Sequence, residues 1–304
     1  MPSKRQNSLL QKRPRRKKPT TPVTPSCVGI YGIGLIGGSI AERLRTGNKK
    51  LNIIGSDIPV VLRKAKRLSL IDEGTGLPEK MLTSTSLIIL AASPSVNKRL
   101  LRSLSQRKCD TEALIIDTGS VLSSISDFAK SLNWKNNATF VSAHPMAGRE
   151  LSGLENRQSN LFESHPFFFD DSVSLSSHDL ALIDWLNASL GSYSLFVDSA
   201  HHDQVMTDIS HLPQIVSTVI GSFLRNHTAE TLGLAGTGLQ SMIRLGGSPY
   251  PLWRDVFKEN RENILARLDV LIEDLQSARE EIANGGSKMS PRFKRAQRSY
   301  QCLW

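Results

Sequence analysis

Two hydrophobic patterns follow one another along the chain and divide it near residue 198. Before that point, short apolar runs alternate with stretches whose apolar residues recur at helical spacing. The runs predict strands at 28–31, 51–56, 87–92, 113–116, 139–143, 167–169 and 194–197. Helical spacing predicts helices from a glycine-rich turn to about residue 45, over 60–70 and over 178–190. This alternation indicates an α/β, Rossmann-like domain with a mostly parallel, doubly wound sheet.

From residue 199 onward the pattern is helical throughout. Apolar residues recur at helical spacing over 202–226, 228–243 and 251–283, with no strand signal between them. We therefore expect two domains, at 27–198 and 199–284, with the second entirely helical. The apolar faces of that second part exceed what one small helical layer would bury, so we expect it to form a dimer.

The net charge of +10 is concentrated at the two ends of the chain. Residues 1–26 carry +8 and residues 285–304 carry +5, neither with any acidic residue, and the remainder is −3. Such segments are typical of solvated, disordered tails. We therefore expect basic tails at 1–26 and 285–304 and regard nucleic-acid binding by a folded face as unlikely.

Composition narrows the setting further. No apolar run reaches 18 residues, so no membrane span is expected, and no apolar segment follows the basic N-terminal residues as it would in a secretory signal. The three cysteines at 27, 109 and 302 form neither a metal spacing nor a disulfide framework. This usage fits a reducing cytoplasm, and no metal site is expected.

A Gly-x-Gly-x-x-Gly turn at 32–37 lies between a predicted strand and a predicted helix. Gly32 permits the tight turn, Gly34 lets the backbone approach a pyrophosphate, and Gly37 allows close packing of helix on strand. The amides of this turn, with those of Leu35 and Ile36, then face the phosphates at a helix N-terminus. The turn predicts a dinucleotide site.

Polar residues after the neighbouring strands extend this site. Asp57 ends the second strand, where a carboxylate accepts hydrogen bonds from a ribose 2′-hydroxyl and repels a 2′-phosphate, so NAD is favoured over NADP. A capping residue of the loop is the alternative for Asp57. Ser93, Pro94 and residues 117–120 follow later strands and are expected to line the same crevice.

His144 is the main candidate for chemistry. It follows the fifth predicted strand, about one cofactor domain after the glycine-rich turn. An imidazole titrates near neutral pH, so it can take a proton from a substrate hydroxyl while a bound nicotinamide takes a hydride from the same carbon. A structural histidine in a loop is the alternative.

The sequence resembles the prephenate/arogenate dehydrogenase family of tyrosine biosynthesis. The resemblance is carried, in order, by GIGLIGGS at 32–39, DTGSV at 117–121, HPMAGRELSG at 144–153, HDQ at 202–204, SHLPQ at 210–214 and RLGGSPYPLWRD at 244–255. It implies a Rossmann-like domain followed by a helical dimerisation domain. It also implies an NAD-dependent oxidative decarboxylation in which a ring hydroxyl loses its proton and carbon dioxide departs as the ring becomes aromatic.

The same resemblance assigns roles. His144 is the base, with Ser120 hydrogen-bonding in the site to orient the imidazole or the hydroxyl. Arg244 suits a carboxylate clamp because guanidinium pairs with a carboxylate through two hydrogen bonds; a helix-surface ion pair is its alternative. Three further residues, His202, His211 and Gln214, are expected to hold substrate or nicotinamide; a buried core histidine is the alternative for His211.

Three positions depart from many relatives. Arg149 stands where many have Thr, Leu122 where many have Lys, and Gln214 where many prephenate-preferring members have His. Arg149 and Gln214 resemble the actinobacterial-type subset. These departures leave the choice between the keto acid prephenate and the amino acid arogenate open.

Several functions therefore compete. The first is an NAD-dependent prephenate dehydrogenase, with arogenate dehydrogenase next and oxidation of an amino-substituted prephenate less favoured. A β-hydroxyacid dehydrogenase would need a catalytic lysine in the helical domain, and residues 199–257 contain none. A nucleotide-sensing or nucleic-acid-binding protein would use the basic tails, but it gives no reason for the segment around His144.

Overall fold

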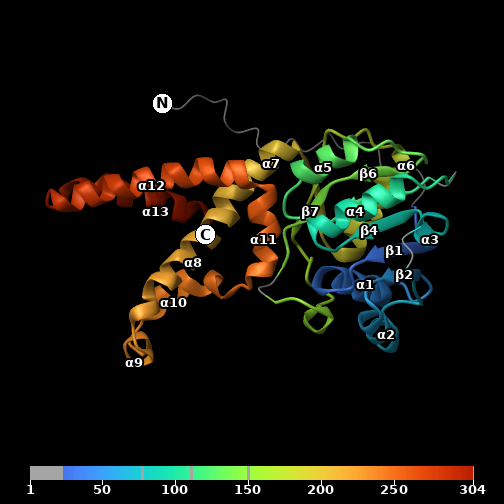
Figure 1. Ribbon diagram of the computed structural model, residues 1–304, viewed down its shortest axis with the longest axis horizontal. Helices are drawn as coiled ribbons and strands as arrows, with labels where there is room; N and C mark the ends of the chain where they lie inside the picture. The colour runs from blue at the N-terminus through green and yellow to red at the C-terminus, as the bar shows by residue number, and fades with distance from the viewer. Residues whose placement is uncertain (1–22, 77–78, 110–111, 149–150, 304) are drawn as a thin grey trace.

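The computed structural model describes residues 23–76, 79–109, 112–148 and 151–303 (Figure 1). A sheet-containing part and a helical part lie side by side, and the helical part extends away from the sheet as two long arms. The α/β class and the helical second part expected from the sequence are both present. No helix in the described ranges has the length and apolar character needed to cross a bilayer.

The main sheet has six parallel strands in the order β3-β2-β1-β4-β5-β6. The chain adds β2 and β3 on one side of β1 and then β4, β5 and β6 on the other side. This is the strand order of a dinucleotide-binding fold, and it opens a crevice between β1 and β4. The strands are buried apolar runs, as a parallel sheet covered on both faces requires. Their bounds are β1 Cys27–Tyr31, β2 Asn52–Ser56, β3 Glu73–Gly74, β4 Leu87–Leu90, β5 Leu114–Asp117 and β6 Thr139–Val141.

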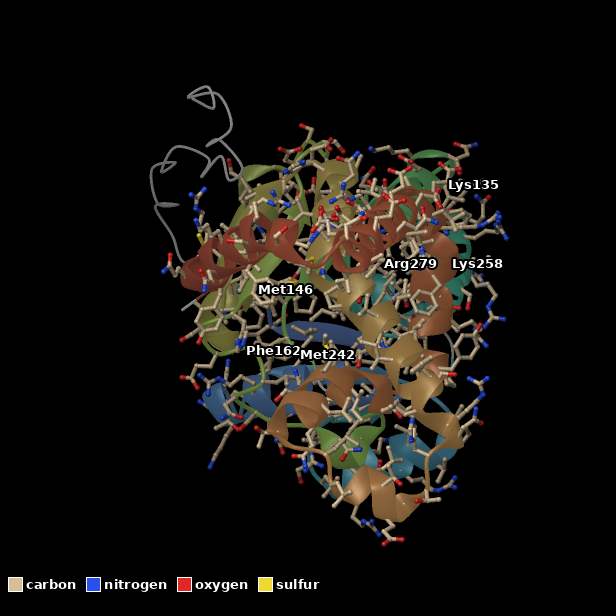
Figure 2. The ribbon with its side chains drawn as sticks, turned by 90° about the vertical axis from the view of Figure 1, so that its left-hand side faces the viewer. Lys135, Met146, Phe162, Met242, Lys258 and Arg279 are labelled. Carbon is tan, nitrogen blue, oxygen red and sulfur yellow. The ribbon has the colours of Figure 1, made fainter. Side chains whose placement is uncertain are left out.

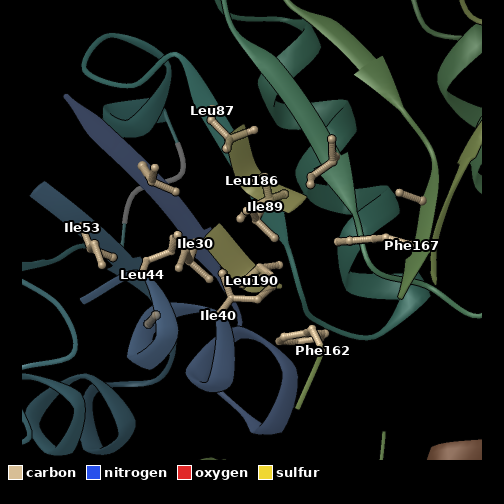
Figure 3. Close-up of a cluster of buried hydrophobic side chains, with 14 of the residues drawn as sticks. Ile30, Ile40, Leu44, Ile53, Leu87, Ile89, Phe162, Phe167, Leu186 and Leu190 are labelled. Atoms are coloured by element: carbon tan, nitrogen blue, oxygen red, sulfur yellow. The ribbon is translucent and has the colours of Figure 1, made fainter. Parts of the chain in front are cut away.

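Two apolar clusters cover the two faces of this sheet. The larger one joins alternate strand residues, such as Ile30 and Ile89, to Ile40 and Leu186 on helices (Figure 3). The second includes Leu101 and residues of the opposite strand faces. The helices of this part are α1 Leu35–Gly47, α2 Pro59–Arg67, α3 Glu79–Leu82, α4 Pro94–Ser105, α5 Ser123–Lys130, η1 Leu154–Asn156 and α6 Ser177–Leu190.

The fifth predicted strand is in fact two. β6 ends at Val141, and after buried Ser142 the chain enters β7 Ala143–Pro145, which pairs antiparallel with β8 Pro166–Asp170 in a second sheet. That sheet is completed by β9 Tyr193–Val197, parallel to β8. The single continuous strand expected over 139–143 is therefore wrong. A continuous apolar run does not show where a chain changes sheets, because both halves are buried.

The helical part begins at α7 and contains one π-helical turn, η2. Its elements are α7 Ser199–Met206, η2 Thr207–His211, α8 Leu212–Phe223, η3 Leu224–Asn226, α9 Ala229–Gly233, α10 Thr237–Ile243, η4 Arg244–Gly247, α11 Tyr250–Glu259, α12 Arg261–Ala283, η5 Ser287–Met289 and α13 Ser290–Leu303. Large apolar side chains remain exposed along its arms: Phe223 is 74% exposed, Leu234 84% and Met242 54%. Met242 is labelled in Figure 2.

The end of the chain departs from the sequence expectation. Disorder was expected after residue 285, but Ser290–Leu303 form α13. Arg292 explains part of this order, because its guanidinium lies 3.1 Å from Asp274 and 3.2 Å from Glu281, both on α12. One basic residue of this segment thus pairs with two acidic residues of the preceding helix. Residues 1–22 of the other predicted tail lie outside the described residues.

Candidate active site

The glycine-rich turn has the shape that a pyrophosphate needs. Gly32 has φ +82°, and a Cβ on Gly37 would lie 1.9 Å from the carbonyl oxygen of Gly32. A Cβ on Gly34 would meet no atom within 4 Å, so the backbone there is open. The turn is tight where helix meets strand and uncovered where a ligand would approach.

A cleft of about 630 Å³ runs from this turn to the helical part. Its walls come from the ends of β1, β4 and β5, from the segment after β7, and from α8 and α11. Residues expected in the site meet here. They are Gly34, Leu35, Ile36, Ser93, Pro94, Ser120, His144, His211 and Gln214.

His144 reaches this cleft from the middle of β7. It is paired with Phe168 of β8, so its ring is held by a strand rather than by a loop. Burial, with the nearby rings of His202 and His211 adding to it, holds the pKa of His144 well below 6.5. The imidazole is therefore neutral at pH 7, as a proton acceptor must be.

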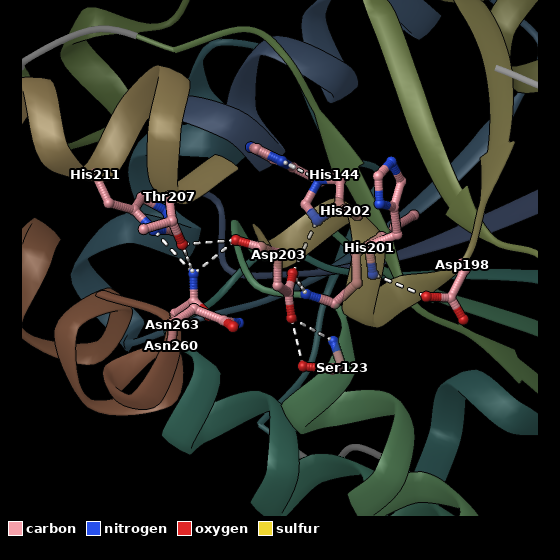
Figure 4. Close-up of polar contacts among 12 residues, drawn as sticks. Ser123, His144, Asp198, His201, His202, Asp203, Thr207, His211, Asn260 and Asn263 are labelled. Atoms are coloured by element: carbon pink, nitrogen blue, oxygen red, sulfur yellow. Dashed lines mark hydrogen bonds and ion pairs between the residues drawn. The ribbon is translucent and has the colours of Figure 1, made fainter. Parts of the chain in front are cut away.

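Behind His144, two buried side chains continue inward. His144 Nδ1 lies 3.1 Å from His202 Nε2, and His202 Nδ1 lies 2.8 Å from Asp203 Oδ1 (Figure 4). Both inner side chains are fully buried. His202 was expected to touch substrate or nicotinamide, but it is absent from the described lining of the cleft and contacts His144 instead.

Two polar residues line the wall opposite, at the junction of η2 and α8. His211 Nδ1 lies 3.0 Å from Asn260 Nδ2, and burial lowers the pKa of His211 to about 4. A neutral ring whose Nδ1 accepts from Asn260 has its proton on Nε2. Gln214 Nε2 donates to the carbonyl oxygen of Leu245 at 2.9 Å, while its buried Oε1 has no partner in the described structure.

Comparison with known proteins agrees with this geometry. The model of the prephenate dehydrogenase nucleotide-binding domain matches residues 40–191, and that of the prephenate dehydrogenase dimerization domain matches residues 198–295. The chain belongs to the prephenate dehydrogenase family. It is therefore an NAD-binding oxidoreductase, as the resemblance implied.

Relatives in this family cover most of the chain. The prephenate dehydrogenase of Lactococcus lactis is 30% identical over 259 residues, 84% of this chain and 69% of that protein. The cyclohexadienyl dehydrogenase of Zymomonas mobilis is 25% identical and covers 91% of this chain and 95% of its own. Aquifex aeolicus prephenate dehydrogenase, solved with hydroxyphenyl propionate and NAD+, is 27% identical with a TM-score of 0.81, covering 91% of this chain and 98% of that chain.

Other expected site residues of this family member lie outside the cleft lining. Arg244 lies in η4, is exposed, and is not among the residues that line the cleft of the single chain. The expected clamp on a substrate carboxylate is therefore not formed within one chain. Asp57 accepts from the backbone amides of Ile33 and Ile58, each at 2.7 Å, and so braces the glycine-rich turn. Ser120, in contrast, does line the cleft, but the side chain hydrogen-bonded to His144 is that of His202. Arg149 lies outside the described residues.

The sequence interpretation missed two polar residues of this family site and misplaced a third, Asp117. The Asp203 carboxylate is hydrogen-bonded to Nδ1 of His202, and the Asn260 amide is hydrogen-bonded to Nδ1 of His211. Asp117, expected to line the crevice, is buried and accepts from the amide of Ala143 at 2.9 Å; burial raises its pKa to about 7. Asp203 had one visible signal, a carboxylate directly after a histidine in a helix. Asn260 had none, because it joins the site from the turn between α11 and α12, 49 residues after His211.

Proposed function

We propose that this chain catalyses the NAD-dependent oxidative decarboxylation of prephenate, which yields 4-hydroxyphenylpyruvate and carbon dioxide. One observation carries the proposal: a neutral histidine, His144, faces a cleft that begins at an open glycine-rich turn. The scattered cysteines support a cytoplasmic enzyme.

The chemistry follows from the geometry around His144. Its Nδ1 is held by His202, so Nε2 is the nitrogen left to accept the proton of the substrate hydroxyl. When bound, NAD supplies the hydride acceptor for the carbon that carries this hydroxyl. As the carbonyl forms, the ring carboxylate leaves as carbon dioxide with its bonding electrons moving into the ring. Those electrons reach the newly formed carbonyl oxygen, which takes a proton to give the phenol, and aromaticity drives the reaction.

The described residues fit the cofactor. Gly34, Leu35 and Ile36 present the N-terminal end of α1 to the cleft, and Ser93 and Pro94 begin α4 on its other side. The negative charge of Asp57 stands beside this turn, which supports NAD over NADP because it would repel a 2′-phosphate.

Arogenate is the second candidate, and Gln214 favours it. Leu245 fixes the direction of the amide, so the acceptor Oε1 is the atom left to bind a ligand. The ammonium group of arogenate donates hydrogen bonds, whereas the keto oxygen of prephenate only accepts them. Among the described lining residues there is also no lysine or arginine, while the carboxylate of Asp255 is present.

A homodimer through the helical part belongs to the same proposal. Phe223, Leu234 and Met242 are exposed on its arms, and burial of such side chains against a second copy would be favourable. The family's description of this segment as a dimerization domain supports this assembly.

The test is NADH formation by the purified protein with prephenate and, in parallel, arogenate. His144→Asn should lower kcat by a factor of about 10²–10⁴ while NAD affinity stays within about twofold, because the base alone is lost. His178→Asn, an exposed histidine on α6, is the matched control. Bound NAD without turnover of either substrate would show that the proposal is wrong.

A further inference from the structure

A line of three side chains leads from the cleft into the interior (Figure 4). His144 comes from β7, and its ring stands nearly perpendicular to that of His202, at 86° with centroids 5.2 Å apart. His202 and Asp203 come from α7 in the helical part. The line therefore joins the two parts of the molecule, with only its first member at the cleft.

The hydrogen bonds of Asp203 determine where the protons of this line lie. Its Oδ1 accepts from the amide of Leu122 at 2.8 Å, and its Oδ2 accepts from the amide of Ser123 at 2.9 Å and from the Ser123 hydroxyl. A carboxylate only accepts, so His202 must present an N–H from Nδ1. When His202 is neutral, its Nε2 has a lone pair and accepts from the Nδ1–H of His144.

The groups packed around His144 and His202 offer few other hydrogen-bond partners to the two rings. Phe168 packs edge-on against His202 at 5.2 Å and offers no polar atom. His211 is the other titratable ring nearby; it is connected to Asp203 through Asn260, which donates to the backbone oxygen of Asp203 at 2.9 Å. On the far side of β7, Asp117 binds the amide of Ala143 and holds the backbone rather than the ring.

We propose that Asp203 is a positioning residue which, through His202, keeps the proton of His144 on Nδ1 and leaves Nε2 to receive the proton of the substrate. When that proton arrives, the Asp203 carboxylate, acting through His202, stabilises the positive charge on His144. A carboxylate behind a catalytic histidine acts in this way in hydrolases, and here a second imidazole stands between them. The catalytic half of this inference rests on the proposed function, whereas the tautomer does not.

The tautomer can be measured without substrate. Ring-¹⁵N histidine labelling of the full chain with NAD at about pH 7.5 should show Nδ1 protonated and Nε2 unprotonated in both rings. Resonances are assigned by their loss in His144→Asn and His202→Phe. A proton on Nε2 of His144 would overturn the inference, even if prephenate and arogenate were both inactive and the proposed function had failed.

Kinetics test the second half. Asp203→Asn removes the negative charge. Because each carboxylate oxygen accepts from a backbone N–H, the new NH2 group would face one of these donors whichever way the amide is turned. We expect kcat to fall about 100-fold or more. KM and the Kd for NAD should stay within about threefold. The matched control is Asp198→Asn, at the N-cap of the same helix, where Asn caps equally well; it should keep kcat within about threefold.

A second variant guards against misfolding. Asp203 binds the start of α5, so Asp203→Asn could loosen the contact between the two parts. His202→Phe retains a ring beside Phe168 and leaves Asp203 bound to α5, yet it breaks the line. It should lose kcat to a similar extent. A kcat within about fivefold of the unchanged protein, in either variant that still binds NAD, would overturn the catalytic role.

Discussion

Acid should destabilise the folded chain through His211, which lies in the wall of the cleft. The ring is 1% exposed, and burial lowers its pKa from 6.5 to about 4. Protonation would also place an N–H at Nδ1 opposite the amide of Asn260, 3.0 Å away. Because the folded pKa lies below the unfolded one, the unfolded state binds more protons below pH 6.5. The stabilisation is therefore complete above about pH 6.5 and is lost as the pH falls towards 4.

The size of this effect follows from the two pKa values. Linkage between 6.5 and about 4 removes about 2 kcal/mol from the free energy of unfolding between pH 7.5 and pH 5. His144, whose pKa is also lowered, adds a loss of the same sign, so the comparison must isolate His211. His211→Gln does this, because its side-chain oxygen can still accept from Asn260 while the titrating group is gone.

The assay is urea unfolding at both pH values and at one protein concentration, since association would shift the midpoint. The unchanged protein should lose about 2 kcal/mol more than His211→Gln, and His165→Gln, at an exposed position, should behave like the unchanged protein. Equal losses in the unchanged protein and His211→Gln would refute the reasoning. So would a pKa near 6.5 for His211 in an NMR titration.

Two further predictions concern the cofactor turn. Gly37→Ala places a methyl group 1.9 Å from a carbonyl oxygen of the turn, so NAD affinity should fall at least about tenfold by titration calorimetry, whereas Gly47→Ala, with open space around it, should bind normally. Asp57→Asn retains an oxygen for the backbone bond but removes the charge, so the ratio of kcat/KM for NADP to that for NAD should rise about tenfold. An unchanged ratio would show that Asp57 only braces the turn.

Much of the sheet part was readable locally. Strands such as β1 and β4 are apolar runs long enough to cross the sheet. The turn between β1 and α1 needs glycine at positions 32 and 37, because φ is positive at the first and a Cβ would clash with the turn backbone at the second. Both constraints arise within a few consecutive residues. The helical part showed its own periodicity. The single strand expected over 139–143 was wrong because burial on both sides looks the same whether a chain stays in one sheet or enters another.

The candidate site, too, was predictable from the sequence only in part. His144, Gln214 and the glycine-rich turn were found from motifs and do line one cleft. His202 was also found, but it was expected to contact substrate or nicotinamide, and it contacts His144 instead. The residues next to it in the sequence do not show whether its side chain lies at the cleft or behind another residue. Arg244 was given a substrate role that the geometry of one chain does not support.

By itself, the sequence determined the alternation of strands and helices before residue 198, the helical character after it, the cofactor turn and the candidate histidine, because each depends on residues close together in the chain. Tertiary structure alone decided which nitrogen of His144 faces the cleft. That depends on His202, 58 residues away, and on an Asp203 carboxylate held by amides 80 and 81 residues before it. Hydrogen-bond direction is set by partners brought together in folding, and no local pattern encodes it.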